Sequence, residues 1–166
     1  RRSGVIRFEK PVLDVGLTAL TLDLAAESSR VTARLAAASR EAGQLRADGT
    51  ATLAREGRLW TLPRSAPLTW TARLDDSDLR IVRPFLPLGV RTDARLDAQL
   101  KGSGSLAAPQ VDGRIAASAI RFAMPEEGIV IRDGRLDLVL EGERVRVAQG
   151  ELAGSGGRIV VSGEAE

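Results

Sequence analysis

The sequence predicts an all-β protein whose sheet has one apolar face and one charged face. Aliphatic residues occupy every second position along most of the chain, as in the segment Arg95 to Lys101. A period of two places alternate side chains on opposite faces of a strand. Turn residues recur between these segments, and a spacing of about 8–12 residues is typical of all-β folds. The pattern predicts roughly ten to thirteen strands, mostly antiparallel.

The N-terminal segments predict strands with one change of phase. A first short strand spans Val5 to Glu9. Alternation continues from Leu13 to Leu17 and resumes from Leu20 to Leu24 in the opposite phase. One extra residue reverses the face that a strand presents, so the slip at Thr18-Ala19 predicts a bulge or a turn.

Residues 24–47 are compatible with both a helix and strands. Their Ala, Arg and Glu content suits a helix, and helical spacing links Val31 with Leu35. The alternating segments on both sides favour strands instead. The elements expected next are a strand over Leu45–Leu53, a turn at Gly57, a strand over Leu59–Leu62, a turn between Pro63 and Pro67, and a strand over Leu68–Leu74.

Residues 77–87 interrupt the alternation and predict one short helix. Ser77 or Asp78 is suited to cap its N-terminus, and apolar residues between them and the C-terminal end share one helical face. Pro84 and Pro87 limit it to about two to three turns.

Strands resume after this helix, and the chain is expected to form one domain. The domain spans 1–166, with sub-repeats over residues 1–76 and 88–166 separated by the helix. The expected strands are Val90–Lys101, Val111–Ala117, Ile120–Met124, Ile129–Arg132, Leu136–Leu140, Val145–Leu152 and Arg158–Ser162. The expected turns are Gly102–Ser105, Pro125–Gly128, Asp133-Gly134, Glu141–Glu143 and Gly154–Gly157.

Composition excludes several classes of function. The 24 basic and 22 acidic residues interleave, which argues against a nucleic-acid partner. Cys, His and Tyr are absent, so disulfides, thiolate chemistry and the commonest general base are missing. No apolar run approaches the ~20 residues of a membrane-spanning helix. We therefore expect no enzyme activity, no catalytic residue, no metal and no cofactor. The start at Arg1-Arg2, without a visible signal peptide, suggests a piece of a longer protein.

Three local features have competing interpretations. Asp75-Asp76 and Asp78 suit Ca²⁺ binding, but the favoured interpretation is that they cap and solvate the following helix. Gly154–Gly157 resembles a phosphate-binding loop, yet it precedes a strand rather than a helix and is expected to be a turn. Trp60 and Trp70 are expected to be core or groove-edge residues rather than sugar-stacking platforms.

The apolar face must be buried, either by self-packing into a sandwich or against a ligand in an open groove. Small residues recur on this face and large aromatic residues are nearly absent, which favours a groove. The expected lining residues are Leu20, Leu22, Leu24, Val31, Leu35, Leu45, Leu53, Leu68, Trp70, Leu74, Leu96, Ala98, Leu100, Val111, Ile115, Ala117, Ile120, Phe122, Met124, Ile129, Ile131, Leu136, Leu138, Leu140, Val145, Val147, Ile159 and Val161.

Two segments carry a family resemblance. Leu100 to Gly113 reads L-x-G-x-x-S-L-x-x-P-x-x-x-G. A second element begins with Ile131–Leu138 and ends with Gly156–Gly163. Together with Pro67–Trp70 and Phe85–Pro87 upstream, their order and spacing resemble the TamB family, the translocation and assembly module proteins of Gram-negative envelopes, within the AsmA-like group.

The resemblance covers most of the chain, best over residues 44–163. It implies a β-taco, a curled sheet forming an open hydrophobic groove, in the periplasmic portion of an inner-membrane-anchored protein. Such proteins are similar to bridge-like lipid transfer proteins, and this chain would be an internal or near-C-terminal slice. The resemblance also implies a barrel partner similar to TamA, acting through the parent protein.

Two functions remain open at this point. In the first, phospholipid acyl chains slide passively along the groove between the inner and outer membranes. In the alternative, the chain is a scaffold or chaperone that offers its groove or sheet edge during assembly of outer-membrane proteins such as autotransporters.

Overall fold

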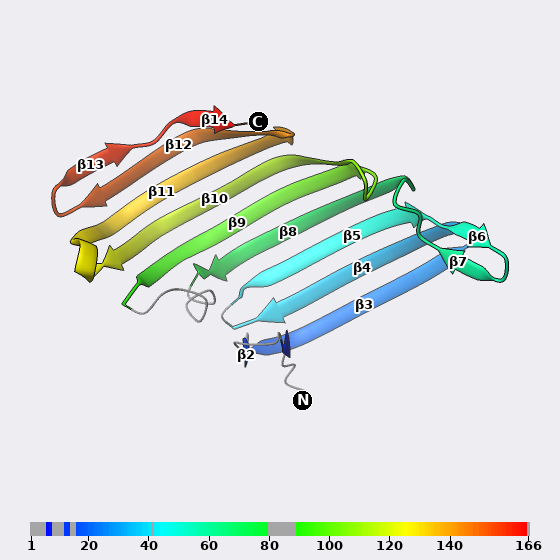
Figure 1. Ribbon diagram of the computed structural model, residues 1–166. Coiled ribbons are helices and arrows are strands. Elements are labelled where there is room, and N and C mark those ends of the chain that lie inside the picture. The colour runs from blue at the N-terminus through cyan, green and yellow to red at the C-terminus, as the bar shows by residue number, and fades with distance from the viewer. Residues whose placement is uncertain (1–5, 8–11, 14–15, 41, 80–88, 166) are drawn as a thin grey trace.

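The chain forms a nearly all-β structure, which confirms the predicted fold class. The computed structural model describes residues 6–7, 12–13, 16–40, 42–79 and 89–165. Figure 1 shows the long strands lying side by side in one large open sheet.

Two small hairpins accompany the large sheet. In one, β1 (Ile6–Arg7) pairs with β2 (Val12–Leu13), and in the other β6 (Ala54–Glu56) pairs with β7 (Leu59–Thr61). A 3₁₀ turn, η2 (Pro125–Glu127), joins β10 to β11. The strands of the large sheet are β3 (Leu17–Glu27), β4 (Arg30–Ser39), β5 (Gln44–Thr52), β8 (Leu68–Asp78), β9 (Arg91–Gly104), β10 (Pro109–Met124), β11 (Ile129–Gly142), β12 (Arg144–Gly154), β13 (Gly157–Val160) and β14 (Gly163–Ala165).

The large sheet is an antiparallel meander. Nine of its ten strands follow the order β13-β12-β11-β10-β9-β8-β5-β4-β3, and the tenth, β14, pairs with β12 beside β13. The two halves of the chain join in this sheet through the β8–β9 ladder. The sheet is not closed, because β3 and β13 lie at opposite ends of the order. Within residues 24–47, where strands were favoured over a helix, the chain forms parts of β3 and β5 and all of β4.

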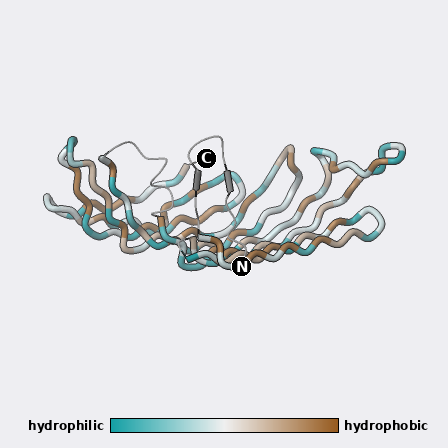
Figure 2. Tube along the Cα trace, turned by 90° about the horizontal axis from the view of Figure 1, so that it is seen from below, coloured by the Kyte–Doolittle hydropathy of each residue, from teal (hydrophilic) through white to brown (hydrophobic). Residues whose placement is uncertain are grey.

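Bulges accompany the curvature of the sheet. Register shifts interrupt the β3–β4, β8–β9, β9–β10 and β11–β12 ladders. The first lies between Leu17 and Ala19, so the predicted phase change at Thr18-Ala19 is a bulge and not a turn. Bulges bend the strand that carries them and increase its twist. In Figure 2 the strands rise at both ends, so the sheet forms a shallow trough whose axis crosses the strands.

The bulge in β10 contains a strained alanine. Ala119 has a φ of 50° and lies within the register shift between Ser118 and Arg121. The left-handed conformation costs an L-residue about 1–2 kcal/mol, which exceeds the entropic cost of glycine, about 0.5–1 kcal/mol. Ala119→Gly is therefore expected to raise the free energy of unfolding by about 0.5 kcal/mol in urea denaturation.

Ala123, in the regular part of β10, provides the matched control. Ala123→Gly is expected to lower the free energy of unfolding by about 0.5–1 kcal/mol, because only the entropic cost applies. Equal destabilisation by both substitutions would contradict the strain at Ala119.

The predicted helix over 77–87 is only partly tested. Residues 80–88 lie outside the described part of the chain. Ser77 and Asp78, proposed as capping residues, are the last two residues of β8, and their capping of the following segment stays a prediction. A register shift between Leu74 and Ser77 allows the strand to continue through a segment where the alternation changes phase.

Two predicted turns are also wrong. Gly102 and Ser103 belong to β9, and the chain reverses over residues 105–108 instead. Asp133-Gly134 lies inside β11, beside a register shift between Ile131 and Asp133. Gly134 serves close packing there, because a Cβ would contact a side-chain methyl of Leu152 at 2.6 Å. Glycine is common both in turns and at positions in strands where a neighbouring group approaches closely. The sequence pattern alone did not distinguish these two roles.

The described residues do not form a closed core. The buried hydrophobic residues are Ala51, Ala66 and Ala94, and no large side chain is fully buried in the described ranges. Substantial contacts between the long strands are all made by hydrogen-bonded neighbours. Within the described part of the chain, therefore, no second layer covers either face of the large sheet.

Candidate functional site

Strand register gathers the aliphatic residues into continuous rows across the sheet. Each row consists of directly opposed residues, whose side chains therefore lie on the same face. One row contains Leu20, Ala37, Leu45, Leu74, Ala98, Ile115, Leu138 and Val147. The next contains Leu22, Leu35, Ala47, Ala72, Leu100, Gly113, Leu140 and Val145. We call this surface the apolar face.

Nearly all the predicted lining residues belong to the apolar face. Ile120 lies at the β10 bulge but remains on this face, since its Cβ is 3.2 Å from a Cβ built on Gly134. Val161 follows β13, and its N–H donates a hydrogen bond of 2.8 Å to the Gly150 carbonyl. Leu53 is the exception, because it lies between β5 and β6 and outside the large sheet.

The apolar face is most exposed at the edges of the sheet. Leu20, Leu22 and Leu24 of β3 are 59–68% exposed, and Ile159 of β13 is 58% exposed. Residues of the central rows, such as Leu100, are half-buried. Because no second layer covers them in the described ranges, this partial burial comes from neighbours within the sheet.

Glycines create space for the indole ring of Trp70 on this face. Trp70 is directly opposite Gly49 on β5 and Gly102 on β9. A Cβ at Gly102 would collide with the indole ring, so the ring lies across the backbone of β9. Trp70 is half-buried on the apolar face, whereas Trp60 lies in the separate β6–β7 hairpin and is 50% exposed.

Sequence reasoning missed several members of the apolar face. Leu152 pairs with Ile159 and packs beside Gly134. Its phase differs from that of Val147 because a register shift intervenes between these residues on β12. The slip in alternation after Val147 was the signal that marks this bulge. Strand parity alone could not assign residues beyond the slip.

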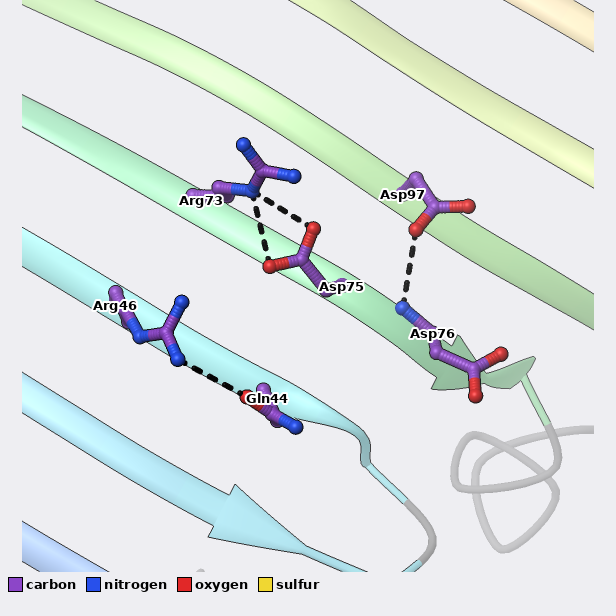
Figure 3. Close-up of polar contacts among 6 residues, drawn as sticks. All are labelled: Gln44, Arg46, Arg73, Asp75, Asp76 and Asp97. Atoms are coloured by element: carbon purple, nitrogen blue, oxygen red, sulfur yellow. Dashed lines mark hydrogen bonds and ion pairs between the residues drawn. The ribbon is translucent and has the colours of Figure 1, made fainter.

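Charged residues occupy the opposite, polar face and pair locally. Arg73 Nε donates to Asp75 Oδ1 at 2.8 Å and to Oδ2 at 3.0 Å (Figure 3). Arg114 Nη2 lies 2.9 Å from Asp137 Oδ2. Exposed pairs of this kind contribute at most about 1 kcal/mol each, so they add more to solubility than to stability.

Asp75 and Asp76 of the acidic segment contact polar groups on β8 and β9. Asp75 bonds to Arg73, and the backbone N–H of Asp76 donates to Asp97 Oδ1 at 3.0 Å (Figure 3). Asp76 also lies 3.7 Å from Arg95. The carboxylates are thus matched by neighbouring donors on β8 and β9. Nowhere in the described ranges does a cluster of three acidic residues suitable for a metal ion occur.

Hollows occur on both faces of the sheet. One has a volume of about 620 Å³ and lies on the polar face over β5, β8, β9 and β10. A smaller hollow of about 340 Å³ includes apolar-face residues of β11, β12 and β13, among them Ile129, Ile131 and Ile159. The apolar face is therefore an open surface with a hollow at one corner, and the polar face carries a hollow of greater volume.

Comparison with known proteins leaves these surfaces as the basis for assigning function. No family model matches the chain, and searches of curated proteins and of solved structures found no match either. In the described part of the chain, no helix is long and apolar enough to cross a membrane.

Proposed function

We propose that the apolar face binds the acyl chains of phospholipids and guides their movement by passive sliding. The observation that carries this proposal is a wide antiparallel sheet whose aliphatic face has no second layer over the described residues. Contiguous exposed apolar surfaces of this kind usually mark sites of interaction. The aliphatic rows offer nondirectional contact, which suits a hydrocarbon chain.

The energetics favour guidance over tight binding. Burying about fifteen methylenes at ~0.8 kcal/mol each removes on the order of 12 kcal/mol of unfavourable hydration. A bilayer offers an acyl chain the same shelter, so transfer from membrane to protein is expected to be nearly neutral. A nearly neutral site allows lipids to enter, slide and leave.

The direction of sliding follows from the geometry of the rows. Each row continues from β3 to β12, and adjacent strands are about 4.8 Å apart. Lipids moving along a row would cross the strands, parallel to the trough axis in Figure 2. The charged headgroups would remain in water while the tails contact the rows.

The wider assignment rests on the resemblance to the TamB family together with the open curled sheet. In this proposal the chain is part of the periplasmic portion of an inner-membrane-anchored protein that connects the two membranes of a Gram-negative envelope. A barrel partner similar to TamA would act through the parent protein. No enzymatic step and no cofactor are required.

Mass spectrometry of organic extracts tests the proposal directly. Protein purified without detergent is expected to yield phospholipid in a reproducible ratio to protein, because bound acyl chains would shield the aliphatic rows from water. Extracts that contain no phospholipid, from protein that also fails to take up lipid from vesicles, would contradict lipid binding.

A second candidate function is favoured by the edge of the sheet. β3 (Leu17–Glu27) is 11 residues long, and among the described strands it pairs with β4 alone. Unpaired edges accept further strands through backbone hydrogen bonds. In this alternative, the chain offers the β3 edge to unfolded outer-membrane strands, and charged substitutions in the central apolar rows would leave that pairing intact.

A further inference from the structure

A broad hollow lies on the face opposite the aliphatic rows. Its volume of about 620 Å³ falls in the range of small-molecule sites. It lies over four adjacent strands. Its lining includes Ala72, Leu100 and Gly113, which lie between two polar cross-strand rows in sequence, and its polar lining residues belong to those two rows. The first row is Arg46, Arg73, Gln99 and Arg114, and the second is Asp48, Thr71, Lys101 and Asp112.

The first row places like charges against each other. Arg46 on β5 is directly opposite Arg73 on β8. Gln99 on β9 separates Arg73 from Arg114 on β10. Like charges on directly opposed residues destabilise an antiparallel pair. The opposed arginines therefore do not stabilise the fold by themselves. With an anion bound between them, the same two charges would become stabilising.

The guanidinium groups retain donors for such an anion. Arg73 uses Nε for Asp75, and the dashed lines in Figure 3 reach that carboxylate from Nε and not from the two terminal nitrogens. Arg114 uses Nε and Nη2 for Asp137, which leaves Nη1. These carboxylates hold both groups in place while their outer nitrogens stay available.

Two further cations lack an acidic partner. Arg46 contacts the side-chain oxygen of Gln44 at 3.3 Å, and neither Arg46 nor Lys101 has a carboxylate within ion-pair distance in the described ranges. Planar guanidinium groups match the oxygens of phosphate, and lysine adds a point charge. The cations around the hollow therefore suit a phosphate group.

The acidic residues in the second row restrict the ligand further. Asp48 accepts a hydrogen bond of 2.7 Å from Thr71 Oγ1, and Asp112 accepts one of 3.0 Å from the Gly142 N–H. Each carboxylate carries a negative charge that would repel a bare anion. Each also has free oxygen lone pairs that can accept hydrogen bonds from hydroxyl groups. We infer that this hollow binds a phosphate ester of a polyol, with phosphate on the arginine row and hydroxyls on the acidic row.

The inferred site is independent of the proposed lipid track, because the two occupy opposite faces. A polyol phosphate occurs both as a free compound and as the headgroup of a glycerophospholipid. The chemistry is shared, and the probes below separate the two sources.

The test is an NMR titration of the ¹⁵N-labelled protein with sn-glycerol 3-phosphate. The Nε–H signals of Arg46, Arg73 and Arg114 are expected to shift together, with glycerol alone producing no shift. Arg46→Gln/Lys101→Gln is expected to weaken binding at least about tenfold, since charged hydrogen bonds contribute strongly. High salt is expected to weaken it as well.

Arg146→Gln is the matched control. Arg146 follows Arg114 and Val139 in the same cross-strand row but lies outside the hollow, so its substitution should leave the affinity unchanged. Absence of a titration, or equal loss in both variants, would overturn the inference. Competition by phosphatidylglycerol vesicles, with none by phosphatidylcholine vesicles, supports a headgroup ligand, while binding without vesicle competition supports a free ester. Leu138→Asp should leave this binding intact, which separates it from the proposed lipid track.

Discussion

Leu138→Asp combined with Leu96→Asp is expected to reduce the phospholipid recovered from the purified protein at least about tenfold. Leu138 lies between Ile115 and Val147 in a central aliphatic row, and Leu96 is opposite Ala117 in the neighbouring row. A carboxylate on this face would have to lose its hydration wherever an acyl chain lies on it. Desolvating a charge without a partner costs several kcal/mol, which exceeds the 1.4 kcal/mol that corresponds to a factor of ten. Extracted lipid and lipid transfer between vesicles are the measurements.

Val139→Asp is the control on the same strand. Val139 is directly opposite Arg114 and Arg146 on the polar face, so an added carboxylate would lie between two cations. This variant is expected to fold and to retain lipid. Undiminished lipid transfer by the folded Leu96→Asp/Leu138→Asp protein would count against the proposed track and favour the edge of β3 as the working surface.

Gly102→Val is expected to destabilise the sheet by about 1–3 kcal/mol, the usual cost of overpacking. A Cβ at this position would collide with the indole ring of Trp70, so the ring must leave the backbone of β9. The displaced indole would be more exposed to water. The measurements are the midpoint of urea denaturation and a red shift of tryptophan fluorescence.

A double-mutant cycle isolates this contact. In a Trp70→Ala background the collision is removed, and Gly102→Val is expected to become neutral or stabilising because β-branched residues suit strands. Gly156, where a Cβ would meet no atom within 4 Å, provides the control substitution Gly156→Val. Additive effects of Trp70→Ala and Gly102→Val would contradict the placement of the ring.

The alternation of aliphatic residues was sufficient to predict the fold class and most of the apolar face. The two-residue period of a strand is a local property, so the alternation within a segment such as Leu68 to Leu74 is enough to predict a strand there. The phase slip at Thr18-Ala19 also marked the position of an irregularity, because an extra residue reverses the face of every later side chain, but the slip left a bulge and a turn equally open.

Other features depended on tertiary neighbours that a local pattern does not contain. Gly102 was assigned to a turn, but it belongs to a strand in which glycine leaves room for Trp70. Leu152 was missed because the preceding shift in β12 changes its parity. The polar hollow was missed for the same reason, since the opposition of Arg46 and Arg73 depends on pairing between strands that are not consecutive in sequence.

Because the long strands contact mainly their hydrogen-bonded neighbours, the molecule behaves as a nearly one-dimensional stack. The length of the sheet across its strands can therefore change without a change in the length of each strand. Inserting or deleting one antiparallel hairpin would change that length by about 10 Å, twice the interstrand spacing. The side chains of the other strands would stay on the same faces of the sheet. Such an architecture can be lengthened in hairpin-sized increments without redesigning an interior.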